Sequence, residues 1–225
     1  MTDAKRIDLH VHSLLSDGAL LPSELLRRVV VKGYTAIAIT DHVDASNMEE
    51  VIASLTRFAR QQEGDFPLTF IPGIELTHVA PLSIAPLARW AKELGAALVV
   101  VHGETLSEPV RPGTNRAAVE CSAVDILAHP GLITLEDARL AAENDIYLEI
   151  TSRKGHCLAN GHVANIACQA GARLVVNTDT HTPQDMIDQE MARRVAAGAG
   201  LKEAEIEAAT VINPQTLVQK AMGKG

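Results

Sequence analysis

Residues 7–12 read Ile7-Asp8-Leu9-His10-Val11-His12, a short apolar run that ends in two histidines. Side chains alternate along an extended strand, so His10 and His12 are expected to point to the same side. Both imidazoles can then face one ion, because imidazole is a ligand of zinc, iron and manganese. A lone His-x-His pair is weak evidence, since such pairs also occur in ordinary cores. The segment predicts a strand, and the rest of the chain decides whether that strand carries a metal site.

Six further short segments are β-branched and nearly all apolar, as is typical of parallel strands covered by helices. With the first, the predicted strands are residues 6–11, 36–40, 69–76, 97–101, 125–128, 146–151 and 173–178. Segments of helical period lie between and after them, near residues 22–32, 46–62, 81–94, 115–121, 135–144, 161–170, 183–197 and 202–209, with another after Pro214. Seven βα units predict an α/β fold, a distorted seven-stranded parallel (βα)7 barrel with C-terminal helices.

The competing architecture is an open, doubly wound sheet, which would concentrate its site at one switch point. Here residues of the metal-ligand type end nearly every predicted strand, and the strand ends of a barrel converge on one rim. This favours the barrel. A length of 225 residues fits one domain. We expect residues 1–225 to form it, with a barrel core at about residues 6–182 and C-terminal helices at about residues 183–222.

Composition narrows the class of partner. Hydrophobic residues make up 47% of the chain, which is enough for a substantial core. Aromatic residues make up only 3% and the formal net charge is −8, which argues against nucleic acid as a partner. Bound divalent cations would reverse the charge locally, so an anionic substrate remains open.

Three features favour a cytoplasmic protein without a membrane partner. The start of the chain, Met1–Asp8, is polar and lacks the apolar core of a secretion signal. No apolar run is long enough to span a bilayer. The cysteines Cys121, Cys157 and Cys168 form no CxxC pair and cannot all pair with one another, which is simplest in a reducing compartment.

The metal-ligand chemistry of the first strand recurs along the chain in recognisable motifs. Leu9-His10-Val11-His12-Ser13, followed by Ser16-Asp17-Gly18, resembles the first motif of the polymerase and histidinol phosphatase (PHP) family. Ile39-Thr40-Asp41-His42 resembles the second motif. The family's remaining motifs are matched, in the same order, by four further segments of this chain. They are Pro72-Gly73-Ile74-Glu75, Val101-His102, Leu127-Ala128-His129-Pro130 and Thr178-Asp179-Thr180-His181. The resemblance runs from about residue 7 to residue 182 and covers most of the chain.

The resemblance implies a seven-stranded barrel that holds three divalent ions (zinc, manganese or iron) through nine side chains. One ion would lie among His10, His12, Glu75 and Asp179, with Glu75 bridging to a second ion at His102 and His129, and Asp17, His42 and His181 would hold the third. Such a cluster suits hydrolysis of a small phosphorylated metabolite by metal-bound hydroxide. The resemblance therefore implies a metal-dependent phosphoesterase, a histidinol-phosphatase-like phosphomonoesterase, with these nine residues as both metal ligands and catalytic residues.

Two alternatives belong to different classes. A metal-dependent amidohydrolase, which cleaves C–N bonds, also begins with His-x-His and ends with Asp on the last strand. That superfamily has eight strands and often a carboxylated lysine as bridge, where this chain has seven predicted strands and Glu75. The other alternative is a non-catalytic metal-binding PHP module. Loss of ligands would mark it, and all nine ligand positions are kept here.

Substrate contacts are expected in two loops. Arg153 and Lys154 directly follow the sixth predicted strand, where a guanidinium suits a phosphate with two hydrogen bonds. Arg116 lies at the end of the 103–116 loop after the fourth strand, and loops of this kind set specificity on barrels. Glu149 lies inside an apolar strand, where it is expected to orient either a ligand histidine or the loop of Arg153.

Overall fold

A closed wall of parallel strands organises the computed structural model, which describes residues 5–223. The two ends of the predicted domain 1–225 therefore lie outside the described residues. The wall has the strand order β1-β2-β4-β5-β6-β7-β8, and every neighbouring pair is parallel. The strands are β1 (Arg6–Asp8), β2 (Tyr34–Ile39), β4 (Thr69–Leu76), β5 (Leu98–His102), β6 (Ile126–Ala128), β7 (Tyr147–Thr151) and β8 (Leu174–Asn177). A two-residue strand, β3 (His42–Val43), pairs with β4 off this path.

The barrel closes between the segments that follow β1 and β8. The His12 amide donates to the Thr180 carbonyl at 2.8 Å, and the Asp179 amide donates to the His10 carbonyl at 3.0 Å. Val11 and Thr180 form an isolated parallel bridge beside them. The predicted α/β (βα)7 barrel is thus confirmed, and its seam runs through the first and last of the candidate ligand segments.

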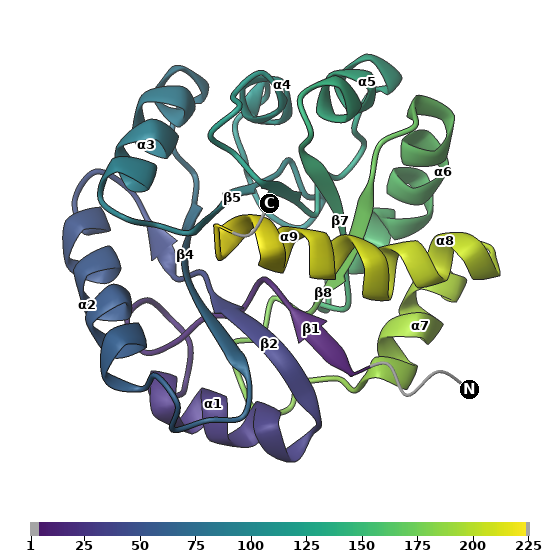
Figure 1. Ribbon diagram of the computed structural model, residues 1–225. Helices are drawn as coiled ribbons and strands as arrows, with labels where there is room; N and C mark the ends of the chain where they lie inside the picture. The colour runs from purple at the N-terminus through teal and green to yellow at the C-terminus, as the bar shows by residue number, and fades with distance from the viewer. Residues whose placement is uncertain (1–4, 224–225) are drawn as a thin grey trace.

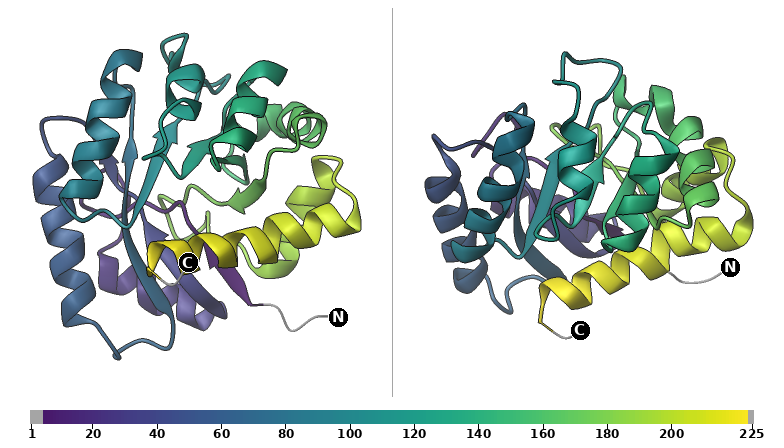
Figure 2. Two further views of the ribbon diagram at one scale, coloured as in Figure 1. Left: turned by 45° about the horizontal axis from the view of Figure 1, so that its top comes forward. Right: turned by 90° about the horizontal axis from the view of Figure 1, so that it is seen from above.

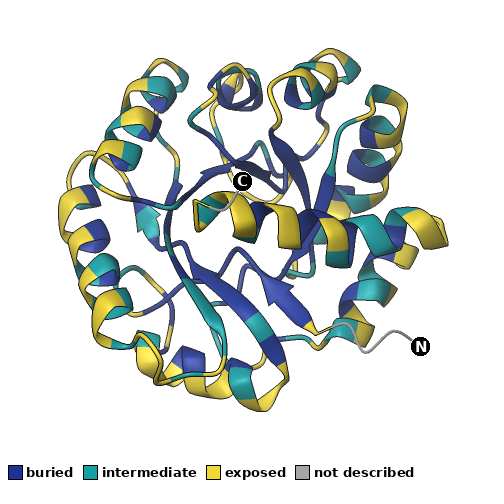
Figure 3. Ribbon diagram, in the orientation of Figure 1, coloured by how far each residue is buried: buried dark blue, intermediate teal, exposed yellow. Residues whose placement is uncertain are grey.

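Helices surround the wall on its outer side (Figures 1 and 2). They are α1 (Pro22–Val31), α2 (Met48–Gln61), α3 (Pro81–Glu93), α4 (Thr114–Val119), α5 (Leu135–Glu143), α6 (Asn160–Ala170), α7 (Gln189–Gly198), α8 (Glu203–Glu207) and α9 (Asn213–Ala221). Proline begins α1 and α3, where its missing amide proton costs nothing. Helices α1 to α7 each bury one face on the strands and leave their polar face in solvent, whereas α8 packs against α7 (Figure 3). Within the described residues, no helix has the length and apolar character needed to cross a membrane.

The helix after the last strand starts later than its sequence predicts. We expected it from residue 183, but α7 begins at Gln189. The reason is local hydrogen bonding. The Asp185 carboxylate accepts bonds from the Thr182 amide at 2.7 Å and from its hydroxyl at 2.9 Å, which holds residues 182–185 in a turn. Asp188 then caps α7 by accepting a bond from the amide of Met191 at 2.8 Å.

One mouth of the barrel is plugged. Apolar side chains fill its interior in a cluster made of Ile7, Leu9, Ala36, Ala38, Ile71, Leu98, Val100, Ile126, Ala128, Tyr147, Val175 and Leu217. Leu217 belongs to α9, which crosses the barrel in Figure 1. Asn213 at the start of α9 donates to the carbonyl of Leu174, the first residue of β8, at 2.7 Å. The helix therefore covers the amino ends of the strands and leaves the carboxyl ends as the accessible rim.

Candidate metal centre

All nine predicted ligand residues lie together at the carboxyl-end rim. The buried carboxylate of Glu75 is at the middle of them. Its Oε1 is 3.3 Å from Nε2 of His10, and its Oε2 is 2.6 Å from Nδ1 of His42 and 3.7 Å from Nε2 of His12. His129 Nε2 is 3.9 Å from the same Oε1. Glu75 thus lies within 4 Å of members of all three predicted groups.

The deepest group joins His10 and His12 to Asp179 across the barrel seam. His12 Nε2 is 3.1 Å from Asp179 Oδ1, and both histidines are fully buried. Asp179 adopts a left-handed backbone conformation (φ 52°), and so does His129 (φ 30°). Residues without glycine's freedom adopt this conformation at a cost of about 1–3 kcal/mol, which the surroundings must offset. Strain at two ligand positions is typical of a functional site.

Buried polar atoms without partners gather in this group. They are Nε2 of His10, both ring nitrogens of His12 and His129, Oε1 of Glu75 and Oδ1 of Asp179. An unpaired buried polar group costs several kcal/mol by transfer measurements, on the order of 2–7 kcal/mol. A set of imidazole nitrogens and carboxylate oxygens that point at one another, unpaired, is the donor set that divalent metals bind. The residues present therefore fit a metal centre.

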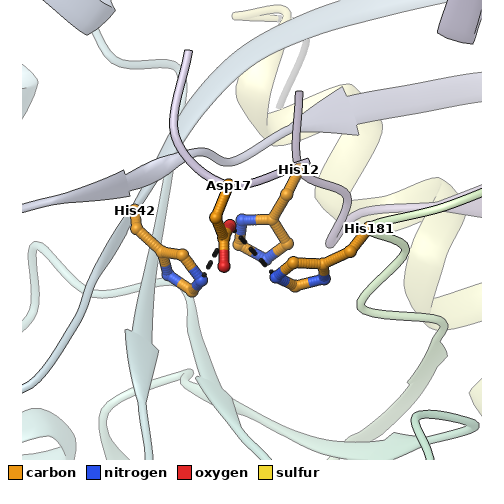
Figure 4. Close-up of side chains that lie close together, drawn as sticks. All are labelled: His12, Asp17, His42 and His181. Atoms are coloured by element: carbon orange, nitrogen blue, oxygen red, sulfur yellow. Dashed lines mark ion pairs between the residues drawn. The ribbon is translucent and has the colours of Figure 1, made fainter. Parts of the chain in front are cut away.

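The third group is open to solvent. Figure 4 shows the carboxylate of Asp17 between the rings of His42 and His181, with the ring of His12 next to them. Asp17 Oδ1 is 3.4 Å from His42 Nε2 and 3.2 Å from His181 Nε2. The Asp17 side chain is 59% exposed, whereas His181 is 10% exposed. Substrate would reach the rim from this side.

Glu149, buried in β7, contacts His10 on the side away from Glu75. Its Oε2 lies 2.8 Å from Nδ1 of His10 and accepts a bond from Asn177 Nδ2 at 2.9 Å. A carboxylate on the far nitrogen fixes the ring of a ligating histidine and directs its Nε2 inward. Of the two roles we expected, the structure supports the contact with a ligand histidine.

Replacing Glu149 with glutamine is expected to weaken metal binding without removing a ligand. Loss of such an outer partner lowers metal affinity or activity by about 10- to 100-fold. Competition with a chromophoric zinc chelator measures this affinity. An affinity equal to that of the wild type would show that Glu149 does not orient His10.

Asp41 positions the loop that carries Asp17. Its carboxylate accepts bonds from the Ser13 amide at 2.7 Å, the Ser13 hydroxyl at 2.6 Å and the Ser16 hydroxyl at 2.6 Å. Gly18 lets the same loop approach the chain closely, because a Cβ there would lie 2.3 Å from the His12 carbonyl oxygen. These contacts hold the loop of residues 13–18 in one conformation and so place Asp17 relative to the first strand.

Buried carboxylates hold negative charge in the group. Burial would raise the pKa of Glu75, but His10 and His42 outweigh it and hold that pKa well below its usual range. Burial lowers the pKa of His12 to about 4, so its ring is neutral near neutral pH, as a ligating histidine must be. For His10, burial opposes the charged form, but Glu149, Glu75 and Asp179 raise its pKa well above the usual value. A metal ion would displace the proton of His10, because a ligating imidazole is neutral.

The three predicted substrate contacts lie in different places. Arg153 lines a cleft of about 250 Å³ beside the cluster, with its Nε 3.8 Å from Asp179 Oδ2. Lys154 is exposed to solvent. Arg116 is not brought to the cluster, because it forms ion pairs on the outer surface with Glu120 at 2.6 Å and Glu136 at 2.8 Å.

Four residues that we did not place in the site from sequence also line this cleft: Thr77, His78, Glu108 and His156. Glu108, in the loop after β5, lies 3.2 Å from Nε2 of His102 and 3.0 Å from Nε2 of His78. His156, after β7, lies 3.4 Å from the other oxygen of Glu108. The position of His156 just past a strand end was the one available signal, whereas nothing local marks Glu108.

A parallel barrel with histidines and carboxylates gathered on its carboxyl rim has the donor groups of a metal-binding barrel. The chain belongs to the PHP domain family, whose model matches residues 8–146.

Two curated relatives match nearly the whole chain. The uncharacterized protein MJ1295 of Methanocaldococcus jannaschii is 49% identical over 217 residues, which are 96% of this chain and 99% of the relative. A probable phosphatase of Shewanella pealeana is 29% identical over 213 residues, 84% of this chain and 82% of the relative.

Solved structures share the fold. Histidinol phosphate phosphatase from Lactococcus lactis, in complex with zinc, L-histidinol and phosphate, superimposes with a TM-score of 0.61 at 16% identity over 88% of this chain and 95% of that one. A chain of an archaeal ribonuclease P with mature tRNA gives a TM-score of 0.64 at 14% identity, covering 96% and 89%. At such identities, these likenesses concern the fold.

Proposed function

We propose that the protein is a metal-dependent phosphoesterase, a histidinol-phosphatase-like phosphomonoesterase that hydrolyses a small phosphorylated metabolite. The observation that carries the proposal is the buried cluster of unpaired imidazole nitrogens and carboxylate oxygens around Glu75. Membership of the PHP domain family supports it, as does the similarity to a probable phosphatase. We place the activity in a single domain, residues 1–225.

The nine residues would hold three divalent cations, zinc, manganese or iron. The groups are His10, His12 and Asp179 with Glu75; Glu75 with His102 and His129; and Asp17, His42 and His181. When bound, such cations neutralise phosphoryl oxygens and lower the pKa of a water nucleophile. Other residues of the chain would hold these ligands in place. Glu149 contacts Nδ1 of His10, and Asp41 accepts hydrogen bonds from the loop that carries Asp17.

The cleft beside the cluster favours a small substrate. Its volume of about 250 Å³ is below the roughly 300–1,000 Å³ of pockets that enclose drug-sized ligands. Arg153 is 28% exposed there, so its guanidinium remains available to a phosphate. A guanidinium can donate two parallel hydrogen bonds to phosphate oxygens, which positions the ester without taking part in bond cleavage.

Replacing Arg153 with alanine is expected to raise KM for a phosphomonoester by about 10-fold or more, because a charge-assisted bond is worth about 1.5–3 kcal/mol. Arg57→Ala is the matched control, since Arg57 is an exposed arginine on α2, away from the cleft. Steady-state kinetics of the wild type and both variants give the KM of each. A KM of Arg153→Ala equal to that of the wild type would show that Arg153 does not bind the substrate.

The function itself is tested with a substrate panel on protein of measured metal content. The panel contains p-nitrophenyl phosphate, histidinol phosphate, nucleoside monophosphates and short single-stranded RNA and DNA. We expect turnover of at least one small phosphomonoester. Metal-loaded protein that is inert on every phosphoester would contradict the proposal and favour a non-catalytic metal-binding module. Cleavage of the oligonucleotides alone would replace the small-metabolite assignment with a nuclease.

The amidohydrolase alternative makes a different demand on the site. Its binuclear members often bridge their ions with a carboxylated lysine, whereas Glu75 lies between the groups here. Hydrolysis of an amide, or hydrolytic removal of the amino group of a base, with no phosphoester turnover, would favour that alternative.

A further inference from the structure

We propose that His156 and Glu108 are additional metal ligands, which complete the second metal position together with His102 and His129. This inference rests on the proposed metal function and adds two residues outside the nine motif positions. Glu108 reaches the rim from the loop after β5, and His156 from the first residue of a short 3-10 helix, His156–Ala159, after β7. Both line the same cleft as Arg153 and Asp179.

The first observation is the imidazole cluster itself. One ring nitrogen from each of His102, His129 and His156 lies within 4.8 Å of the others, and all three residues are buried. The rings of His129 and His156 stack with their centroids 4.3 Å apart, and those of His102 and His129 meet edge to face at 4.5 Å. Three buried imidazoles in contact are unusual as packing, because each must bury two polar nitrogens.

The second observation concerns the two ring nitrogens of His129, which have no hydrogen-bond partner. His129 is 2% exposed, and neither of its ring nitrogens has a hydrogen-bond partner. Its backbone is strained as well, with a φ of 30°. A buried side chain held in a costly conformation, with its polar atoms unpaired, points to a ligand at this position.

The third observation is the orientation of His156. Its Nδ1 lies 2.8 Å from the Thr105 hydroxyl and 3.2 Å from the Ser107 hydroxyl. A proton on Nδ1, donated to such an oxygen, leaves the lone pair on Nε2, which is the arrangement of a ligating histidine. Nε2 points at the carboxylate of Glu108, 3.4 Å from its Oε1.

Glu108 supplies the charge that the three imidazoles lack. Its Oε2 lies 3.2 Å from His102 Nε2, while its Oε1 faces His156. Together with the shared carboxylate of Glu75, three neutral imidazoles and Glu108 offer zinc the nitrogen and oxygen donors that it binds. Thr105 and Ser107 belong to the same loop as Glu108, so one loop both orients His156 and brings the carboxylate.

Zinc binding by the full-length protein tests the inference. Wild type, His156→Gln and Glu108→Gln are stripped with a chelator, reloaded with zinc alone, desalted and analysed for bound zinc. Competition with a chromophoric chelator then gives the affinity with which each zinc ion is bound. We expect each variant to lose one tightly held zinc ion or to bind it at least about 10-fold more weakly. Cobalt(II) substitution should show a changed d–d absorption band in the same variants, since the band follows the ligand geometry.

His162→Gln is the matched control, because His162 lies on α6 and bonds to the Ile133 carbonyl at 2.8 Å, outside the cluster. It should keep the wild-type zinc content and affinity. Glu108 is 40% exposed, so Glu108→Gln keeps the test decisive even if His156→Gln does not fold. Variants with the full zinc content, unchanged affinity and an unchanged cobalt spectrum would overturn this inference alone. Wild-type protein without bound zinc, manganese or iron would overturn the proposed function along with it.

Discussion

Glu75→Ala is expected to abolish phosphoester hydrolysis and to lower the number of bound ions. Glu75 is fully buried and lies within 4 Å of His10, His12, His42 and His129. Its removal takes a shared ligand from more than one metal position. The loss of activity should therefore exceed the roughly 10- to 100-fold that follows loss of an outer-shell partner. Turnover of p-nitrophenyl phosphate and elemental analysis of the purified variant measure both effects.

Glu50→Ala serves as the control for that experiment, since Glu50 is exposed on α2. It should keep the activity and metal content of the wild type. His42→Ala, at the solvent-facing group, is also expected to lose turnover with the fold largely retained, which circular dichroism verifies. Full activity in Glu75→Ala or His42→Ala would show that the assignment of the centre is wrong.

Removal of the metals is expected to destabilise the fold. Ligands that bind only the native state stabilise it by about 2.7 kcal/mol at one hundred times their Kd. For a chain of this size, that corresponds to a fall in Tm of about 5–11 °C for each ion removed. Glu75 and Asp179 are buried, with exposed fractions of 0% and 3%, so their carboxylates would then repel each other without a cation between them. Thermal unfolding with and without a chelator measures the shift.

The same scan on Glu75→Ala provides the control. A variant that has lost ions should respond less to the chelator than the wild type does. Return of the wild-type Tm on adding zinc or manganese would show that the effect comes from the metal. An unchanged Tm after complete removal of metal would contradict a native state that depends on bound ions.

The barrel could be predicted from sequence because its strands are locally marked. Nearly every apolar run, such as residues 97–101, ends at or just before a histidine or a carboxylate, and parallel strands bring such ends to one rim. The nine predicted ligand positions come together in the structure for this reason. Glu149 could be singled out because a carboxylate inside an apolar strand needs a buried partner, and His10 provides it.

The errors lie where position depends on contacts distant in sequence. Arg116 looked like a loop residue facing the substrate, but one turn of helix directs it to Glu120 and Glu136 on the outside. Glu108 reaches His156 across 48 residues of sequence, through the fold of a loop without regular structure. The late start of α7 depends on Asp185 and Asp188 accepting backbone bonds, which residue type alone does not reveal.

A metal-dependent phosphoesterase is tested by elemental analysis of the purified full-length protein, paired with phosphate release from the small-phosphomonoester panel on the same sample. We expect about three divalent ions per chain and turnover that stops when a chelator removes them and resumes when they are restored. Protein loaded with metal that releases no phosphate from any substrate, or that binds no divalent ion, would contradict it.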